Sequence, residues 1–262
     1  MRHILSYLFV ILSITFCSSQ LANISDQLDT ALTKLYNTGR FNGAVLYAEH
    51  GKILFQKSLG VTDITSNRPL TWESSFNLAS ISKQFVAICV MILDEKGKLN
   101  IDDNVKKYIP ELPNENVSIR HLLTHTSGIP DYESLFIQNR SPLDTLDNEK
   151  MVKLFVNLKP SSEFEPGTKW NYSNTAYILL AVIIERISKQ TLAGFVNENI
   201  VKPLGLKHTY VHNVYNSNIP ATHVRGFSEK DGKRVINDLF YIDGVTGDGN
   251  FYASTGDILN WE

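Results

Sequence analysis

Two helix-length segments of this sequence have almost no polar face, and they restrict the fold more than any other feature. Residues 85–93 read FVAICVMIL within a predicted helix over 81–95, and residues 175–187 repeat the pattern. A helix that is apolar on every side has to be buried among other elements. We therefore predict two interior helices and a substantial core, in keeping with the ordinary globular composition of 43% hydrophobic and 20% charged residues.

The rest of the chain predicts further helices and one hairpin. Residues 43–47 and 53–59 are strand-like, and the residues 49–52 between them are typical of a tight turn. Helical spacing or a capping residue predicts other helices over 21–38, 118–123, 148–158 and 197–206, with a last one that starts at Ser254 or Thr255. We predict an α/β (α+β) fold in which this hairpin, over 43–60, starts an antiparallel sheet flanked by helices, next to a helical region.

The N-terminus has the pattern of a secretory signal. Arg2 and His3 precede an uncharged, mostly apolar run over 4–16, and Ser19 offers a cleavage point. The run is shorter than the roughly 20 residues of a membrane-spanning helix. We predict a signal peptide over 1–19, no membrane span after its removal, and a secreted or periplasmic protein. Lipidation at Cys17 is the alternative, which bulky Phe16 disfavours.

Residues 20–262 contain no internal repeat or linker, so we expect a single domain. Once Cys17 is removed, Cys89 is the only cysteine, and packing rather than a disulfide has to stabilise the fold. The last predicted helix reaches Trp261 without a stop signal. We expect the domain to be incomplete at its C-terminus and to lack later strands of the sheet.

The charge balance argues against nucleic acid as a partner. Lys and Arg total 25 against 27 Asp and Glu, so no broad basic surface favours nucleic acid. No His-Glu-x-x-His motif or cysteine cluster predicts a metal site. We expect a monomer that acts on a small-molecule or peptide substrate, with no metal and no cofactor.

Ser80 and Lys83 stand at the start of the first apolar helix, three residues apart on one face. The helix N-terminus favours developing negative charge, and apolar surroundings favour a neutral lysine that accepts the serine proton. Chance also produces on the order of one Ser-x-x-Lys in a chain of this length. The placement at a buried helix start, where polar groups are costly, is what points to catalysis.

Tyr172 and Asn174 precede the second apolar helix and lie on the same side if that stretch is extended. A phenol can relay protons, and an amide can bind both an N–H and a carbonyl of a substrate. The structural alternative is an aromatic anchor followed by an asparagine cap.

Three motifs occur in a fixed order: ASISK over 79–83, HLLTHTSGIP over 121–130 and PGTKWNYSN over 166–174. Together they resemble class C β-lactamases and their relatives, which include D-alanyl-D-alanine carboxypeptidases and esterases. The segments GDG over 247–249 and STGD over 254–257 also resemble this group. The Tyr-Ser-Asn sequence is similar to this branch rather than to class A enzymes, whose motif is Ser-Asp-Asn.

The resemblance implies a role for each matching residue. Ser80 is the acylated nucleophile, and its backbone N–H is one oxyanion donor. Lys83 activates Ser80, Tyr172 relays a proton to the leaving group, and Asn174 orients the substrate. The family's third motif, Lys-Thr-Gly or His-x-Gly, is not found in this chain, and we do not accept residues 223–226 (HVRG) as a substitute.

His125 offers another interpretation, a Ser-His-acid triad. We favour a structural role for it, because its motif resembles a family loop near the site and no Gly-x-Ser-x-Gly nucleophile turn is present.

The resemblance predicts a serine hydrolase that forms an acyl-enzyme on Ser80 and cleaves an amide or ester. β-Lactams, D-Ala-D-Ala peptides and small esters stay open, because selective loops vary within one fold. The alternative is a non-catalytic cell-wall peptide-binding or sensor protein that keeps the fold. The missing third motif favours that alternative, whereas retention of all four site residues disfavours it.

Overall fold

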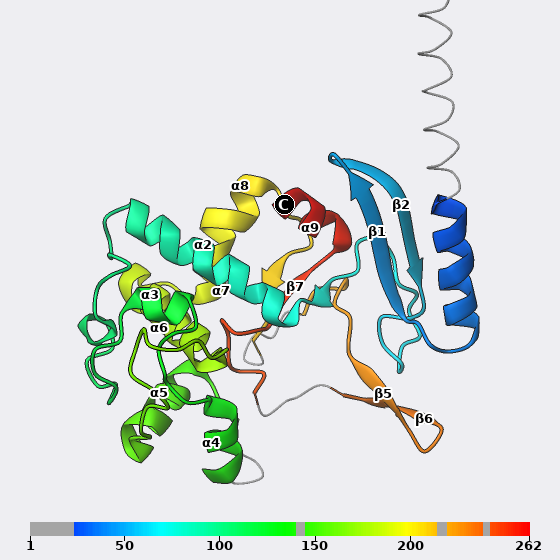
Figure 1. The fold of residues 1–262 in the computed structure, drawn as a ribbon. Coiled ribbons are helices and arrows are strands. Elements are labelled where there is room, and N and C mark those ends of the chain that lie inside the picture. Colours follow the sequence, from blue (N-terminus) through cyan, green and yellow to red (C-terminus); the bar gives the residue numbers. More distant parts are fainter. Residues whose placement is uncertain (1–23, 140–144, 214–218, 238–241) are drawn as a thin grey trace, which may run out of the picture.

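The computed structural model describes residues 24–139, 145–213, 219–237 and 242–262 (Figure 1). The predicted signal peptide over 1–19 and the lipidation alternative at Cys17 lie outside the described residues. Residues 24–37 are helical, and Gly39 follows them with a positive φ of 70°. The helix predicted over 21–38 is confirmed in its described part.

The remaining elements follow in the order of three strands, a series of helices from η1 to α8, four more strands and the helix α9. The strands are β1 (Gly43–Glu49), β2 (Lys52–Leu59), β3 (Phe76–Asn77), β4 (Tyr210–Val211), β5 (Phe227–Lys230), β6 (Lys233–Ile236) and β7 (Phe251–Ala253). The α-helices are α2 (Ser82–Glu95), α3 (Ile119–Leu123), α4 (Tyr132–Asn139), α5 (Asn148–Leu158), α6 (Asn174–Ser188), α7 (Leu192–Val196), α8 (Lys202–Leu204) and α9 (Thr255–Trp261). Short turns of other helix types are η1 (Ala79–Ile81), η2 (Val105–Lys107) and η3 (Asn197–Val201).

Helix α6 is the centre of the helical region. Every residue from 175 to 184 is buried, as the uninterrupted apolar pattern predicts. Helices α2, α3, α5 and α7 all pack against it. The Ser173 side chain caps its start by accepting the Ala176 N–H. Because α6 is enclosed on all sides, its N-terminus holds Asn174 at a fixed position.

Helix α2 differs from the prediction of a helix buried on every side. Phe85, Cys89 and the other residues of one face are buried, but Ile88 and Met91 are 41% and 43% exposed. The run of apolar residues is continuous, yet only the face toward α6 and α7 is covered within the described residues. The apolar run by itself therefore overestimates how much of the surface of α2 is buried.

The described strands pair in three small antiparallel groups rather than in one wide sheet. The hairpin β1–β2 runs in register from Gly43–Leu59 to Glu49–Lys52, with an irregularity at Tyr47–Ala48, and confirms the predicted turn. Strand β7 lies between β3 and β4, and β5 pairs with β6. The sequence did not predict β3, β4, β7 or the β5–β6 hairpin, because strands of two to four residues are too short to show an alternating pattern.

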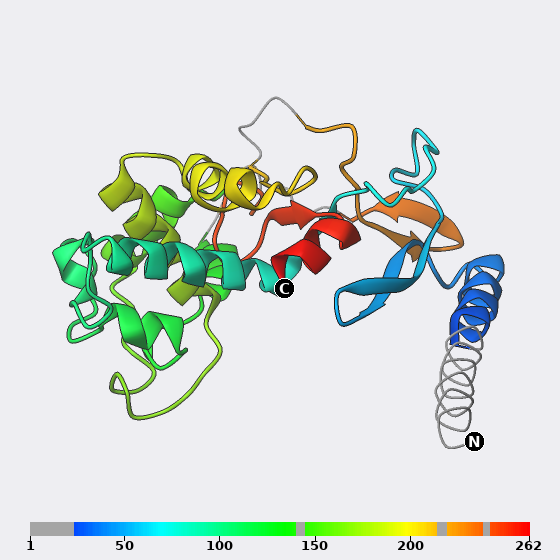
Figure 2. The same cartoon turned by 90° about the horizontal axis from the view of Figure 1, so that it is seen from above.

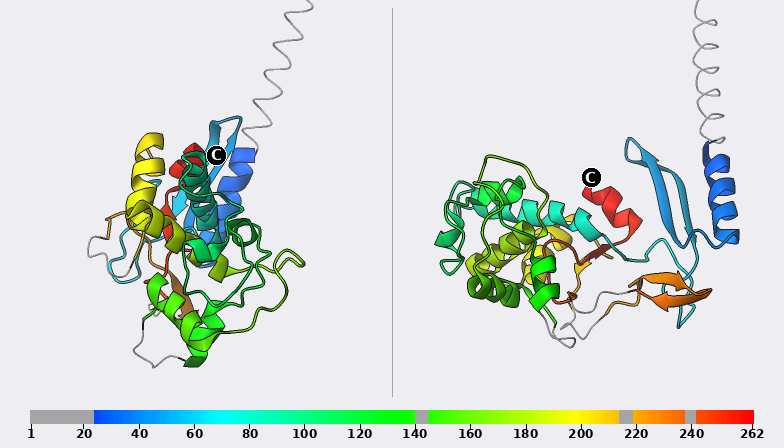
Figure 3. Two further views of the ribbon diagram at one scale, coloured as in Figure 1. Left: turned by 90° about the vertical axis from the view of Figure 1, so that its left-hand side faces the viewer. Right: turned by 60° about the horizontal axis from the view of Figure 1, so that its bottom comes forward.

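The hairpin β1–β2 and the N-terminal helix lie together at one end of the molecule, with α3 to α7 at the other (Figures 1 and 2). Helix α9 lies between them and packs on β1. Ser254 caps α9 as expected, and the Trp261 ring stacks on Phe85 of α2 at 4.1 Å between centroids. The β5–β6 hairpin stands away from the helical end (Figure 3). Among the described helices, none is long and apolar enough to cross a membrane.

Candidate active site

The nucleophile candidate lies in a tight turn between strand β3 and helix α2. Ala79 has a positive φ of 46°, which is costly for a residue with a Cβ, and its N–H donates to Asn77 Oδ1 at 2.8 Å. The turn continues through η1 into α2, and Ser80 is exposed to solvent. The fold therefore presents the Ser80 hydroxyl at the mouth of the helix rather than in the core.

Lys83 lies one turn further along and is buried, with 6% of the residue exposed. Its Nζ has three oxygen neighbours: Ser80 Oγ at 3.2 Å, Asn174 Oδ1 at 2.9 Å and the Asp248 backbone carbonyl at 2.7 Å. The amide and carbonyl oxygens can only accept hydrogen bonds. Nζ donates to each of these three oxygens, and the Ser80 hydroxyl is the one neighbour that can also donate in return.

Tyr172 approaches the same hydroxyl from the loop over residues 159–173. Its phenol donates to Ser80 Oγ at 2.6 Å, and Lys83 Nζ lies 4.9 Å from the centroid of its ring. Asn174 follows as the first residue of α6. The starts of α2 and α6 thus bring together Ser80, Lys83, Tyr172 and Asn174, all four candidates from the sequence.

Asp248 is a contributor that the sequence analysis missed. The GDG segment over 247–249 was noted only as similar to the family, because a backbone carbonyl that binds Lys83 carries no side-chain signal. Gly247 lets this segment approach α6, since it has a φ of 116° and an added Cβ would lie 2.6 Å from the Tyr177 carbonyl oxygen. The Asp248 carboxylate accepts from the Tyr132 hydroxyl at 3.0 Å. Burial raises the pKa of this carboxyl, against the opposing effect of Lys83.

His125 contacts Tyr172 rather than the nucleophile. Its ring stacks on the Tyr172 ring with centroids 4.7 Å apart, and its Nδ1 accepts the Ser173 N–H at 3.1 Å. Burial, followed by the charge of Lys83, lowers the pKa of His125. The neighbours that bond Ser80 Oγ in the described structure are Lys83 and Tyr172, so this geometry favours the structural role over a Ser-His triad.

A cavity of about 980 Å³ opens next to the nucleophile turn. Its wall includes Ala79 directly before Ser80, Tyr132, Asp248 and Tyr252, and His223 from the rejected HVRG segment also lines it. This volume lies at the upper end of what small-molecule sites enclose. The cavity therefore adjoins the turn that carries Ser80, although the residues that line it do not include Ser80, Lys83, Tyr172 or Asn174.

The described ranges hold no group of three or more His, Cys, Asp or Glu residues that is arranged for a metal ion. Cys89 is fully buried in the core, and burial raises the pKa of its thiol to about 12. Its sulfur is therefore a packing group rather than a second nucleophile.

Comparison with known proteins decides the family. A beta-lactamase family profile matches residues 26–262. The chain belongs to the beta-lactamase family. Penicillin-binding protein 4* of Bacillus subtilis (strain 168) is 38% identical over 255 residues, which cover 92% of this chain and 55% of that protein. Esterase EstB of Burkholderia gladioli is 32% identical over 210 residues, 74% of this chain and 53% of the esterase.

A solved structure supports the same assignment. The octameric penicillin-binding protein homologue from Pyrococcus abyssi has a TM-score of 0.76 and 27% identity, and the match covers 90% of this chain and 55% of that one. The chain spans about half the length of the curated relatives it matches. The resemblance and the mixed α/β fold are confirmed at the level of the beta-lactamase family, whereas the class C branch stays a prediction. The monomer expected from the sequence also stays a prediction.

Proposed function

We propose that this beta-lactamase family protein is a serine hydrolase that cleaves an amide or ester through an acyl-enzyme on Ser80. One observation carries the proposal. The Ser80 hydroxyl lies within hydrogen-bonding distance of two groups that can move protons, Lys83 Nζ at 3.2 Å and the Tyr172 phenol at 2.6 Å. This pairing of an exposed hydroxyl with a buried amine and a phenol fits nucleophilic catalysis.

In the first half-reaction, Ser80 Oγ attacks the substrate carbonyl carbon as its proton moves to neutral Lys83. The carbonyl π electrons move onto oxygen, and the start of α2 favours this negative charge. The bond to the leaving group then breaks, and Tyr172 gives its proton to that group. The Lys83 ammonium restores the Tyr172 proton, so no net charge remains on the two residues.

In the second half-reaction, water takes the place of the leaving group and attacks the acyl carbon. Tyr172 and Lys83 accept its proton and return one to Ser80 Oγ as the acid product leaves. Asn174 has two roles in this proposal. Its Oδ1 accepts a hydrogen bond from Lys83 Nζ at 2.9 Å, and its NH₂ group donates to the substrate. The Tyr-Ser-Asn sequence of residues 172–174 supports our placement in the class C-like branch, without a dedicated deacylating glutamate.

The substrate class is proposed from the relatives and the cavity. One relative is named as a penicillin-binding protein and another as an esterase, which supports both amide and ester cleavage. The candidates are D-Ala cell-wall peptides, β-lactams and small esters. A non-catalytic peptide-binding or sensor protein is not supported by these comparisons.

Export is proposed from the sequence. A signal peptide over 1–19, with residues 20–262 as the hydrolase domain, would deliver the protein to the periplasm or the exterior, where cell-wall peptides occur. N-terminal sequencing of secreted material tests the cleavage site after Ser19.

The test of the function is covalent labelling of Ser80. The protein is treated with a fluorescent penicillin and, separately, with a fluorophosphonate, and the adduct is located by intact-mass and peptide mass spectrometry. We expect one adduct on Ser80 that Ser80→Ala abolishes and Ser66→Ala, at an exposed serine outside the site, leaves intact. An adduct that persists in Ser80→Ala, or that is located on Ser127, refutes the assignment.

A further inference from the structure

Tyr172 is held in place by hydrogen bonds on both sides of it, and both lead to His125. The Asn171 N–H donates to the His125 carbonyl oxygen at 2.9 Å, and the Ser173 N–H donates to His125 Nδ1 at 3.1 Å. The two donors are the residues directly before and after Tyr172. His125 therefore sets the backbone position from which the phenol reaches Ser80.

The same imidazole also packs against the phenol ring. The His125 ring is stacked on Tyr172 at 4.7 Å and tilted against Tyr177 at 5.2 Å between centroids, and Trp170 meets it edge-on at 6.1 Å. Stacked rings of this kind restrict the ring plane as well as the distance. One side chain thus restrains both the backbone and the ring of Tyr172.

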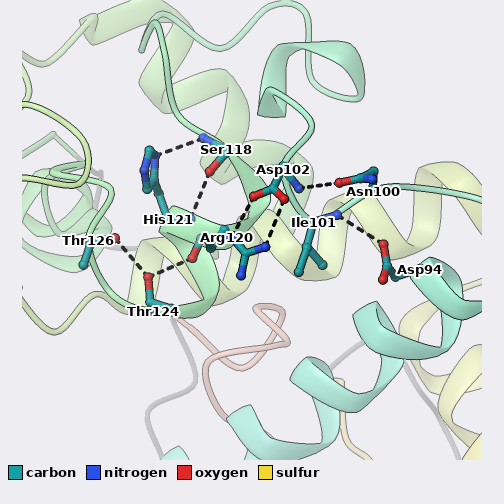
Figure 4. A network of polar contacts seen from close by, with 9 residues as sticks. All are labelled: Asp94, Asn100, Ile101, Asp102, Ser118, Arg120, His121, Thr124 and Thr126. Carbon is teal, nitrogen blue, oxygen red and sulfur yellow. Dashed lines mark hydrogen bonds and ion pairs between the residues drawn. The ribbon is translucent and has the colours of Figure 1, made fainter.

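The residues on either side of His125 take part in a network of hydrogen bonds. Helix α3 directly before it is anchored by two hydrogen bonds from Arg120 to Asp102, at 2.6 and 2.9 Å (Figure 4). The Thr124 hydroxyl bonds the Arg120 carbonyl oxygen at 2.8 Å and the Thr126 hydroxyl at 2.9 Å. His125 has a φ of 59°, a conformation that histidine and asparagine tolerate better than most residues.

We propose that His125 is a positioning residue, which keeps the Tyr172 hydroxyl on Ser80 Oγ and does so only as the neutral imidazole with its proton on Nε2. The inference rests on the proposed function of Ser80. Because Nδ1 accepts the Ser173 N–H, Nδ1 has to carry the lone pair. A second proton on the ring would sit on Nδ1 and face that N–H, which breaks the hydrogen bond and displaces the Tyr172 backbone.

The surroundings favour the neutral form. Lys83 faces the ring from α2, and the phenols of Tyr172 and Tyr177 face it from the 159–173 loop and from α6. Burial and then Lys83 lower the pKa of His125 from its ordinary 6.5. The stability that neutral His125 contributes is therefore complete above about pH 6.5 and is lost as pH falls through the lowered folded-state pKa. The rate of Ser80 acylation should fall over the same range.

Two substitutions of His125 distinguish the effect of its hydrogen-bond acceptor from the effect of its aromatic ring. His125→Phe keeps an aromatic ring but has no acceptor for the Ser173 N–H. His125→Asn lacks the ring but keeps an oxygen at the δ position and tolerates the positive φ. We expect His125→Phe to slow acylation by about a hundredfold, as a misplacement of ~1 Å can, and His125→Asn to retain more of the rate.

The experiment follows the rate of Ser80 labelling by a fluorescent penicillin or fluorophosphonate against pH, in the full chain and both variants. Wild type should show an acid limb in which neutral His125 contributes a midpoint below 6.5. His125→Asn should lose this contribution, because its amide does not titrate, and keep only the limb that the need for a neutral Lys83 produces. An unchanged acid limb in His125→Asn, or a wild-type rate in His125→Phe, overturns the proposal.

A second measurement is independent of activity. NMR of protein carrying ¹⁵N-labelled histidine reports which ring nitrogen of His125 is protonated. We expect Nε2–H at neutral pH, and Nδ1–H at neutral pH overturns the proposal even if a variant fails to fold. If Ser80 is not labelled in wild type at any pH, the proposed function fails, while the NMR result still decides the state of His125.

Discussion

The hydroxyl of Tyr172 lies 2.6 Å from Ser80 Oγ, although 92 positions of sequence separate the two residues. The contact joins the starts of α2 and α6, which pack on each other. Since both helices are fixed by the core, the distance between the two hydroxyls is set by helix packing. The reactivity of Ser80 is therefore coupled to the stability of the helical region.

Removal of the Tyr172 hydroxyl tests the proton relay. We expect Tyr172→Phe to lower kcat/KM on an ester by roughly 10²–10⁴, the usual contribution of a positioned acid or base. The melting temperature should change little, because the residue is 43% exposed. Tyr36→Phe, at a tyrosine with the same exposure, is the control. Unchanged turnover in Tyr172→Phe would remove this residue from the mechanism.

Replacement of Lys83 by arginine tests the need for a lone pair. Guanidinium stays protonated near neutral pH and cannot accept the Ser80 proton. We expect Lys83→Arg and Lys83→Ala to damage Ser80 labelling comparably, measured by intact mass against time. Lys96→Arg, an exposed lysine directly after α2 that bonds Asn199 at 2.8 Å, should behave as wild type. Rescue by Lys83→Arg would show that only positive charge is required.

Substitution of Asn174 by aspartate tests the charge state of Lys83. A carboxylate in place of the amide oxygen, 2.9 Å from Nζ, keeps the acceptor but favours the ammonium form of Lys83. Ester hydrolysis should fall at neutral pH and recover as pH rises, so the optimum shifts upward. Asn139→Asp, on α4, adds the same charge as a control. A pH profile that is scaled down without a shift would contradict a neutral Lys83.

Paired substitutions on α2 test its one-sided burial. Phe85 is fully buried and stacks on Trp261, so Phe85→Ala should cost about 3–5 kcal/mol of unfolding free energy. Ile88 is 41% exposed on the same helix, and Ile88→Ala should cost about 0.5 kcal/mol. Denaturant unfolding measures both. Equal losses would mean that the exposed face of α2 is covered in the protein in solution.

Several elements were predictable because their signals are local. The hairpin over 43–60, the amphipathic α5 and the uninterrupted apolar α6 all follow from spacing within one turn or one pair of strands. Ser80 and Lys83 share a helix face for the same reason. The short strands β3, β4 and β7 carry no such signal, because each is defined by its pairing partner rather than by its own residues.

The sequence by itself determined several of the helices, but not α4 or α7, and it determined that one of them opens with a serine and a lysine on the same face. It also contained Tyr172 and Asn174 before the second helix, but not their distance from Ser80. Only the tertiary structure decided that α2 is buried on one face, that the Asp248 carbonyl binds Lys83 across 165 positions of sequence, and that His125 holds Tyr172. The spacing of apolar residues along one helix predicts only how much of that helix is buried. The contacts named here depend on how separate helices and loops pack together.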